Sequence, residues 1–67
     1  MKALGKRIKE LRKAATLSQE DLSYEADIPL SQVGRIERGE INSTISTLAA
    51  IASALNKDLK ELFNFKY

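Results

Sequence analysis

The sequence contains no cysteine and no histidine among its 67 residues. The absence of cysteine excludes disulfide bonds, and the absence of both residues excludes a metal site built from thiolates or imidazoles. A nucleophile and a general base that acyl-transfer enzymes commonly use are missing for the same reason. We therefore expect no disulfide-stabilised scaffold, no metal and no other cofactor.

Long apolar stretches are absent as well. No run approaches the ~18 consecutive apolar residues that a membrane-spanning helix requires, and the N-terminus lacks the apolar core of a signal peptide. With 43% hydrophobic and 30% charged residues, the composition is typical of a globular domain and not of a disordered chain. A chain of 67 residues allows one core, so we expect a single domain over residues 1–67 that acts in the cytoplasm without a membrane.

The charges are distributed unevenly, although the formal net charge is only +2. Residues 1–13 hold six basic side chains and one acidic side chain, which gives +5, whereas residues 14–67 hold five basic and eight acidic side chains, which gives −3. A basic segment on a mildly acidic domain fits a surface that contacts phosphates, and it fits a solvated amphipathic helix equally well.

The spacing of apolar residues predicts helices along almost the whole chain. Near the N-terminus an apolar residue recurs every three or four positions, which predicts a first helix over roughly residues 2–14. The same pattern predicts further helices over residues 19–26, 30–38, from Ile45 to Leu55, and through Leu59, Leu62 and Phe63. No segment alternates like a β-strand, so the predicted fold is all-α with five helices.

Residues with capping chemistry mark the ends of these helices. The predicted N-terminal caps are Ser18 with Asp21, Thr44, and Asp58 with Glu61. The predicted positions of left-handed backbone, which favours glycine, asparagine and aspartate, are Asp27, Gly39 and Asn56. Proline suits the start of a helix, so Pro29 is expected just before the third helix.

The segment from Gln19 to Arg38 predicts two short helices joined by a turn of three or four residues. Helices joined so tightly cross steeply, which requires a small residue at Ser23 and an unusual backbone angle at Asp27. The angle between the helices must also be filled by apolar residues, here Leu22, Ile28, Val33 and Ile36. This is the pattern of a helix-turn-helix, and an ordinary corner between two helices of a bundle remains the alternative.

The run LSQEDLSYEADIPLSQVGRIERGEINSTISTLAAIASALNKDLKELF, residues 17–63, resembles the Cro/C1-type (XRE) helix-turn-helix family of phage repressors and bacterial regulators. The matching elements are LSQEDL, RIERG, the L-x-x-I-A-x-A-L pattern and DLKELF, in order. The chain departs from the family pattern at Ser23, Asp27, Pro29, Ser43 and Asn56. The resemblance implies a compact five-helix, lambda-repressor-like domain with its helix-turn-helix at approximately 19–38.

The resemblance makes the third helix the recognition helix, which lies in the major groove of double-stranded DNA. A helical wheel with Val33 and Ile36 inward turns Arg35 outward, where it is the best candidate for a bidentate contact to guanine. Solvation is the alternative for these side chains, and partial burial is the alternative for the leucine. The predicted base-reading residues are Leu30, Ser31, Gln32, Gly34 and Arg35.

Other residues are expected to contact the phosphate backbone or to hold the domain together. By resemblance to the family, Gln19 opens the second helix at a phosphate, and Arg12 with Glu37 forms a partly buried structural ion pair. The further residues predicted to contact or attract phosphates are Arg38, Asn42, Ser43, Lys6, Lys9 and Lys13. For the three lysines, simple solvation is an equal alternative.

A single domain of this size buries little surface on DNA, so a homodimer on a pseudo-palindromic operator is expected. The candidate dimer contacts, which could instead cover the domain's own core, are Leu62, Phe63, Phe65 and Tyr67. The predicted function is that of a transcriptional regulator, such as a phage repressor, a controller or an antitoxin, which lies with the nucleoid when bound. The alternative is a module that acts mainly through a toxin or another protein partner. No converging residues predict an enzyme.

Overall fold

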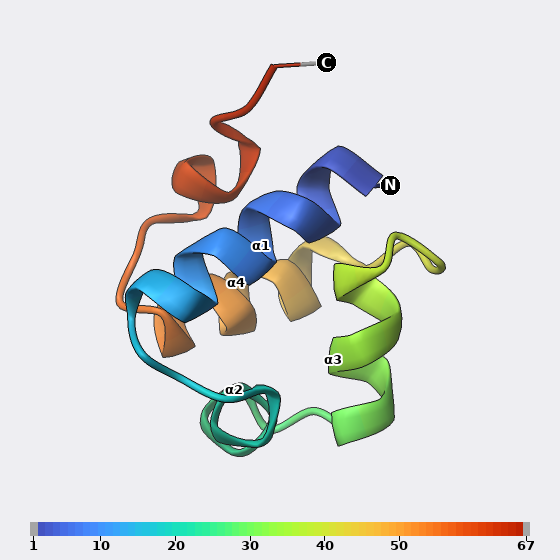
Figure 1. Ribbon diagram of the computed structural model, residues 1–67, viewed down its shortest axis with the longest axis vertical. Helices are drawn as coiled ribbons and strands as arrows, with labels where there is room; N and C mark the ends of the chain where they lie inside the picture. Colours follow the sequence, from blue (N-terminus) through green and yellow to red (C-terminus); the bar gives the residue numbers. More distant parts are fainter. Residues whose placement is uncertain (1, 67) are drawn as a thin grey trace.

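The computed structural model describes residues 2–66, and all regular structure within them is helical. The elements are α1 (Lys2–Ala14), α2 (Gln19–Ala26), α3 (Leu30–Glu37), α4 (Ile45–Ala54) and a 3₁₀ helix, η1 (Leu59–Phe63). Figure 1 shows α1 crossing in front of α4, with α2 and α3 forming the opposite part of the molecule. The prediction of an all-α fold is confirmed.

The fifth predicted helix is the one element that differs in type, because residues 59–63 form a 3₁₀ helix of 5 residues. The predicted capping box is also wrong, since the Asp58 side chain makes no cap hydrogen bond. Glu61 is used differently: its carbonyl oxygen accepts a 2.9 Å hydrogen bond from Arg7 Nε, and its carboxylate lies 3.7 Å from Arg7 Nη2. Contacts with α1 therefore hold this segment, where local capping was expected to do so.

Every element contributes one large side chain that is almost completely buried. These side chains are Ile8 of α1, Leu22 of α2, Val33 of α3, Ile51 of α4 and Leu62 of η1. Burying such a side chain contributes about 1.5–3 kcal/mol. The core is thus shared by all elements, and α3 is held by the same apolar cluster that holds α1 and α4.

The helix ends follow the capping prediction elsewhere. The Ser18 side chain accepts from the Asp21 N–H and the Asp21 carboxylate accepts from the Ser18 N–H, which completes a capping box. Thr44 accepts from the Thr47 N–H at the start of α4. Positive φ occurs at the three expected positions, with 56° at Asp27, 72° at Gly39 and 58° at Asn56, and also at Thr16, with 58°.

Candidate nucleic-acid interface

The turn between α2 and α3 is closed by its own residues. Asp27 is left-handed, and the next N–H, that of Ile28, donates to the Ser23 carbonyl at 3.1 Å. The Ser23 hydroxyl donates in return to the Ile28 carbonyl at 2.6 Å. Ser23 therefore does more than fit a crowded position, since its hydroxyl fastens the turn that orients α3.

α3 begins directly after Pro29, whose φ of −59° suits a helix start and whose side chain supplies no cap bond. The Pro29 carbonyl accepts hydrogen bonds from the N–H groups of Gln32 and Val33 at 3.0 and 3.2 Å. The first turn of this helix is thus closed by backbone hydrogen bonds without a side-chain cap. Its inner face buries Val33 and Ile36 in the core.

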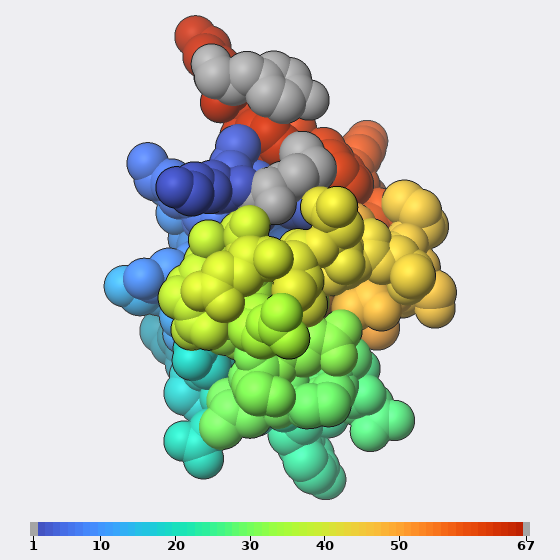
Figure 2. Space-filling view, turned by 90° about the vertical axis from the view of Figure 1, so that its right-hand side faces the viewer, coloured from blue at the N-terminus to red at the C-terminus, as the bar shows by residue number. Residues whose placement is uncertain are grey.

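The outer face of α3 lies at the surface of the molecule, where Figure 2 shows it with the loop that follows. Leu30 is 44% exposed, and Ser31 and Arg35 are exposed as well. Gln32 is half-buried. Of the five predicted base-reading residues, these four therefore present side chains at or near the surface.

Gly34, the fifth of these residues, is buried. A Cβ atom built at this position would lie 2.9 Å from Nη1 of Arg38, so the guanidinium group of Arg38 covers the glycine. The Arg38 side chain is itself 58% exposed. A close approach of another molecule to Gly34 consequently requires Arg38 to move aside.

The far end of α3 is fixed by close packing against α1. A Cβ atom at Gly5 would meet the carbonyl oxygen of Ile36 and would lie 2.6 Å from that of Glu37, so only glycine fits here. Gly39 lies equally close to α1, because a Cβ atom there would be 2.7 Å from the Cα atom of Lys2. Sequence reasoning missed both contacts, since nothing in the local pattern shows which backbone segments touch.

Arg12 and Glu37 form a buried ion pair that joins α1 to α3. Arg12 Nε lies 2.7 Å from Glu37 Oε2 and Nη2 lies 3.1 Å from Oε1, which is a bidentate geometry. Arg12 Nη1 donates to the Leu17 carbonyl at 2.8 Å, and Gln19 Nε2 donates to Glu37 Oε1 at 3.0 Å. The pair thus links the start of α2 to both other helices.

Gln19, which was predicted to contact a phosphate, is also part of this network. It lies half-buried at the first position of α2, and its bond to Glu37 uses one of the two hydrogens of its amide. The network therefore fixes the orientation of the residue that was predicted to contact a phosphate.

Two arginines on α3 and at its C-terminal cap share one carboxylate that the sequence analysis did not single out. Arg38 Nε lies 2.6 Å from Glu40 Oε2, and Arg35 Nε lies 3.9 Å from Glu40 Oε1. Hydrogen bonding to Arg38 lowers the pKa of the Glu40 carboxyl below its usual value, and the same contact raises the pKa of Arg38. The only signal in the sequence was an acidic residue directly after RIERG.

The loop after Glu40 carries the last two predicted phosphate contacts. Asn42 is exposed, whereas the Ser43 hydroxyl oxygen is buried and has no hydrogen-bond partner among residues 2–66. A buried hydroxyl does not reach a phosphate, so the structure does not support a side-chain contact by Ser43.

The helix-turn-helix family model HTH_3 matches residues 8–62 of the chain. The chain belongs to this helix-turn-helix family. It is thereby a DNA-binding regulator of transcription by class, in agreement with the resemblance seen in the sequence.

Individual relatives show the same likeness. The chain is 42% identical over 52 residues to the immunity repressor protein of Bacillus phage phi105, with 78% of this chain and 36% of the repressor covered. It is 36% identical over 59 residues to the control protein C.SmaI of Serratia marcescens, with 88% of this chain and 70% of that protein covered. The chain thus spans about a third of the phage repressor's length.

A solved structure extends the likeness to three dimensions. The restriction-modification controller protein C.AhdI from Aeromonas hydrophila superposes with a TM-score of 0.91 at 39% sequence identity. The match covers 92% of this chain and 94% of that chain. The fold of this helix-turn-helix protein is therefore that of a small controller protein.

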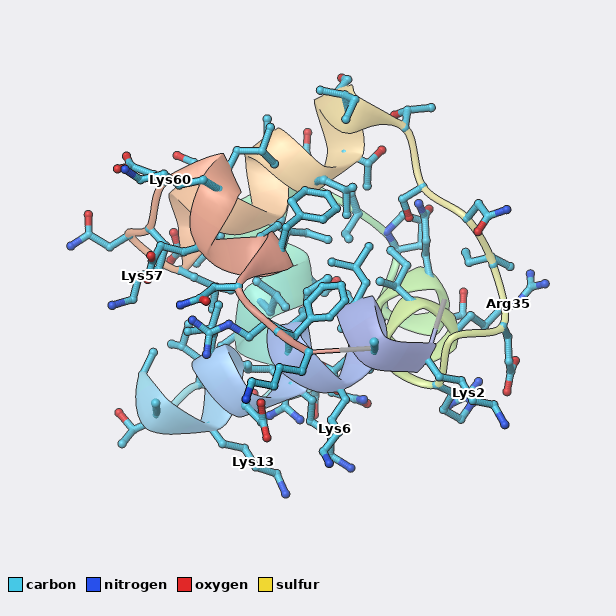
Figure 3. The ribbon with its side chains drawn as sticks, turned by 90° about the horizontal axis from the view of Figure 1, so that it is seen from above. Lys2, Lys6, Lys13, Arg35, Lys57 and Lys60 are labelled. Carbon is cyan, nitrogen blue, oxygen red and sulfur yellow. The ribbon has the colours of Figure 1, made fainter. Side chains whose placement is uncertain are left out.

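This helix-turn-helix protein has exposed basic side chains on α1 and on α3. Lys6, Lys9 and Lys13 are exposed on α1. Figure 3 shows Lys2 on the same side of the molecule as Arg35. Lys2 is therefore a further candidate for a phosphate contact. The backbone of Lys2 packs closely against Gly39, which directly follows the C-terminal cap of α3.

The predicted dimer residues differ in accessibility. Leu62 is 0% exposed and belongs to the core, so it is not available to a partner. Phe65 is half-buried against the core, Phe63 is 41% exposed, and Tyr67 lies outside the described residues. Among the three of these residues that the structure describes, Phe63 is the most exposed.

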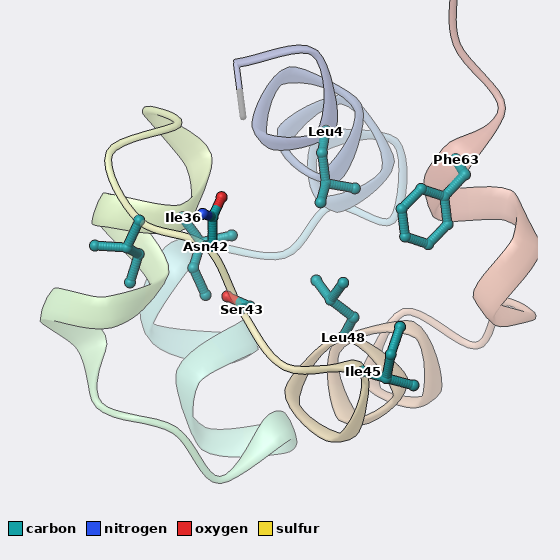
Figure 4. A pocket seen from close by; sticks show the side chains of 8 residues that line it. Leu4, Ile36, Asn42, Ser43, Ile45, Leu48 and Phe63 are labelled. Carbon is teal, nitrogen blue, oxygen red and sulfur yellow. The ribbon is translucent and has the colours of Figure 1, made fainter.

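Phe63 borders an apolar hollow of about 390 Å³ between α1, α3, α4 and η1 (Figure 4). Ile45, which is 64% exposed, lies at the start of α4 and also lines the hollow. The other lining residues are Leu4, Ile36, Ile41, Asn42, Ser43 and Leu48. Ile45 follows the apolar spacing of α4, and this spacing does not reveal that its side chain is exposed.

Within residues 2–66 no helix is both long and apolar enough to cross a membrane. The same residues contain no group of three or more acidic, histidine or cysteine side chains that would bind a metal ion.

Proposed function

We propose that this helix-turn-helix protein binds a specific sequence of double-stranded DNA in the cytoplasm and represses or controls transcription, with α3 in the major groove. The observation that carries the proposal is the exposed outer face of α3, with Leu30, Ser31 and Arg35 at the surface. The glycine contacts and the buried ion pair with α1 hold this face in one orientation. A rigid, projecting helix is what groove recognition requires.

Arg35 is proposed to read guanine through its O6 and N7 atoms, which provides about 1–3 kcal/mol of discrimination. Leu30, Ser31 and Gln32 lie nearer the start of α3 and complete the base contacts, and the backbone at Gly34 approaches the DNA once Arg38 moves to a phosphate. Gln19, Asn42, Lys2 and the lysines Lys6, Lys9 and Lys13 supply the remaining contacts to, or attraction of, phosphates.

We further propose that two copies bind together on a pseudo-palindromic site. The domain measures 29 × 22 × 21 Å, whereas the two half-sites of a palindrome lie about 34 Å apart. One copy is therefore too small to reach both half-sites, and two copies that lie side by side can each present one α3. The apolar surface around Ile45 and Phe63 provides the contact. The apolar hollow beside it equally favours a second candidate function, in which another protein such as a toxin occupies this surface.

Selection of bound sequences from a random pool of DNA duplexes, at low and high salt, tests the proposal. We expect enrichment of a palindrome with half-sites about one helical turn apart, and an affinity that falls as salt rises. The variant Ile45→Ser with Phe63→Ser should then lose the palindrome but retain single half-sites. No enrichment at low salt would contradict DNA recognition and would favour the protein-partner function.

A further inference from the structure

Glu40 contacts both arginines that the proposed function assigns to DNA. Its Oε2 atom accepts a 2.6 Å hydrogen bond from Arg38 Nε, and its Oε1 atom lies 3.4 Å from Arg38 Nη2 and 3.9 Å from Arg35 Nε. The side chains involved are about half exposed, with 55% for Arg35, 58% for Arg38 and 48% for Glu40. The Glu40 carboxylate thus already pairs with the two guanidinium groups that are proposed to contact DNA.

The backbone holds Glu40 in this place. The Gly39 N–H donates to the Ile36 carbonyl at 3.0 Å, and the Glu40 N–H donates to the Arg35 carbonyl at 2.9 Å. With the left-handed φ of 72° at Gly39, these two bonds form the Schellman motif that ends α3. Glu40 is therefore fixed one residue beyond the turn, next to both arginines.

The stability of α3 does not account for an acidic residue here. The C-terminal end of a helix carries a partial negative charge, so a carboxylate at this end is unfavourable for the helix itself. Exposed ion pairs also contribute little to folding stability. A carboxylate does, however, offer a guanidinium group the same paired oxygen acceptors as a phosphate.

We propose that Glu40 is an autoinhibitory contact that competes with DNA for Arg38 and Arg35. This inference rests on the proposed function. Arg38 must leave the carboxylate to reach a phosphate on any duplex, and these bonds to Glu40 are lost whether or not Arg35 then gains hydrogen bonds to guanine. Glu40 therefore lowers the affinity for the operator and for unrelated DNA alike.

The test compares Glu40→Gln with Glu10→Gln, which removes the same charge from an exposed position on α1 beside the C-terminal segment. Both variants and the original protein are titrated onto the selected operator and onto an unrelated duplex of equal length. At low salt we expect Glu40→Gln to bind both duplexes more tightly, by up to about fivefold, the size that one exposed ion pair supports. Glu10→Gln should change both affinities by less than about twofold.

A second comparison asks whether Glu40 acts through Arg38. In a background of Arg38→Gln, the further change Glu40→Gln should lose most of its effect on affinity. The inference is overturned if Glu40→Gln matches Glu10→Gln or if its effect persists without Arg38. If the original protein binds no duplex at low salt, the proposed function itself fails and this inference with it.

Discussion

Replacing Glu37 by glutamine should strongly destabilise the domain. The Glu37 carboxylate receives hydrogen bonds from Arg12 Nε at 2.7 Å, Arg12 Nη2 at 3.1 Å and Gln19 Nε2 at 3.0 Å. A glutamine amide has one accepting oxygen, so its NH₂ group must face a donor in either orientation. The substitution also leaves the Arg12 charge, whose side chain is 9% exposed, without a counter-charge.

The magnitude follows from this geometry. Breaking a buried ion pair costs about 3–5 kcal/mol, and we take about 3 kcal/mol because one acceptor remains. In a domain of this size each kcal/mol lowers Tm by about 4–8 °C, so the expected decrease is about 12–24 °C. A domain below 70–80 residues has a total stability of only about 3–5 kcal/mol, so the variant is expected to be largely unfolded near 37 °C.

Thermal and urea unfolding followed by circular dichroism measure this effect. Glu25→Gln, on the exposed surface of α2, is the matched control and should change stability by less than about 0.5 kcal/mol. The double replacement Arg12→Met with Glu37→Met should be more stable than Glu37→Gln, because it leaves no buried charge unpaired. Equal Tm values for Glu37→Gln and Glu25→Gln would refute the structural role of the ion pair.

Three further substitutions test other parts of the fold. Gly5→Ala places a Cβ atom against the Ile36 carbonyl and should cost about 1–3 kcal/mol in urea unfolding. Leu62→Ala removes a fully buried side chain and should cost about 2–5 kcal/mol; no loss would show that η1 is not part of the core. Ser18→Ala removes a helix cap and should cost about 1 kcal/mol near neutral pH. The backbone N–H of Ser18 and, after it, the Ser18 side chain lower the pKa of Asp21, so the part of the capping box that the Asp21 carboxylate supplies is present above the unfolded pKa and disappears as the pH falls below about 4. Ser18→Ala keeps this backbone N–H and removes the bond from the Asp21 N–H, which does not titrate, so its cost should largely persist in acid; a cost that vanishes between pH 7 and pH 2 would contradict the cap.

Much of the fold could be predicted because its determinants are local. The side chains of Ser18 and Thr44 bond to backbone only three residues away. Three of the four left-handed positions in residues 2–66 fall on aspartate, glycine and asparagine for steric reasons that each residue carries itself, and Thr16 is the exception. The type of the last helix could not be predicted in this way. A segment of 5 residues held by Arg7 has its geometry fixed by α1 and not by its own capping residues.

The candidate site could likewise be predicted only where its determinants lie within one helix. The outward direction of Arg35 follows from helix periodicity once Val33 and Ile36 are placed inside. The pairing with Glu40, the contact at Gly5 and the buried hydroxyl of Ser43 depend on how segments meet in space. No pattern within a single helix carries that information.

The central claim, that the outer face of α3 reads DNA sequence, is tested most directly by the affinity of Arg35→Ala for the selected operator and for an unrelated duplex. The matched control is Lys60→Ala, which removes the same charge on the other side of the molecule (Figure 3). Arg35→Ala should weaken operator binding by about 1–3 kcal/mol and relax the preference at one base pair, while unrelated DNA and Lys60→Ala change little. Equal losses on both duplexes, or an operator affinity equal to that of Lys60→Ala, would contradict the claim.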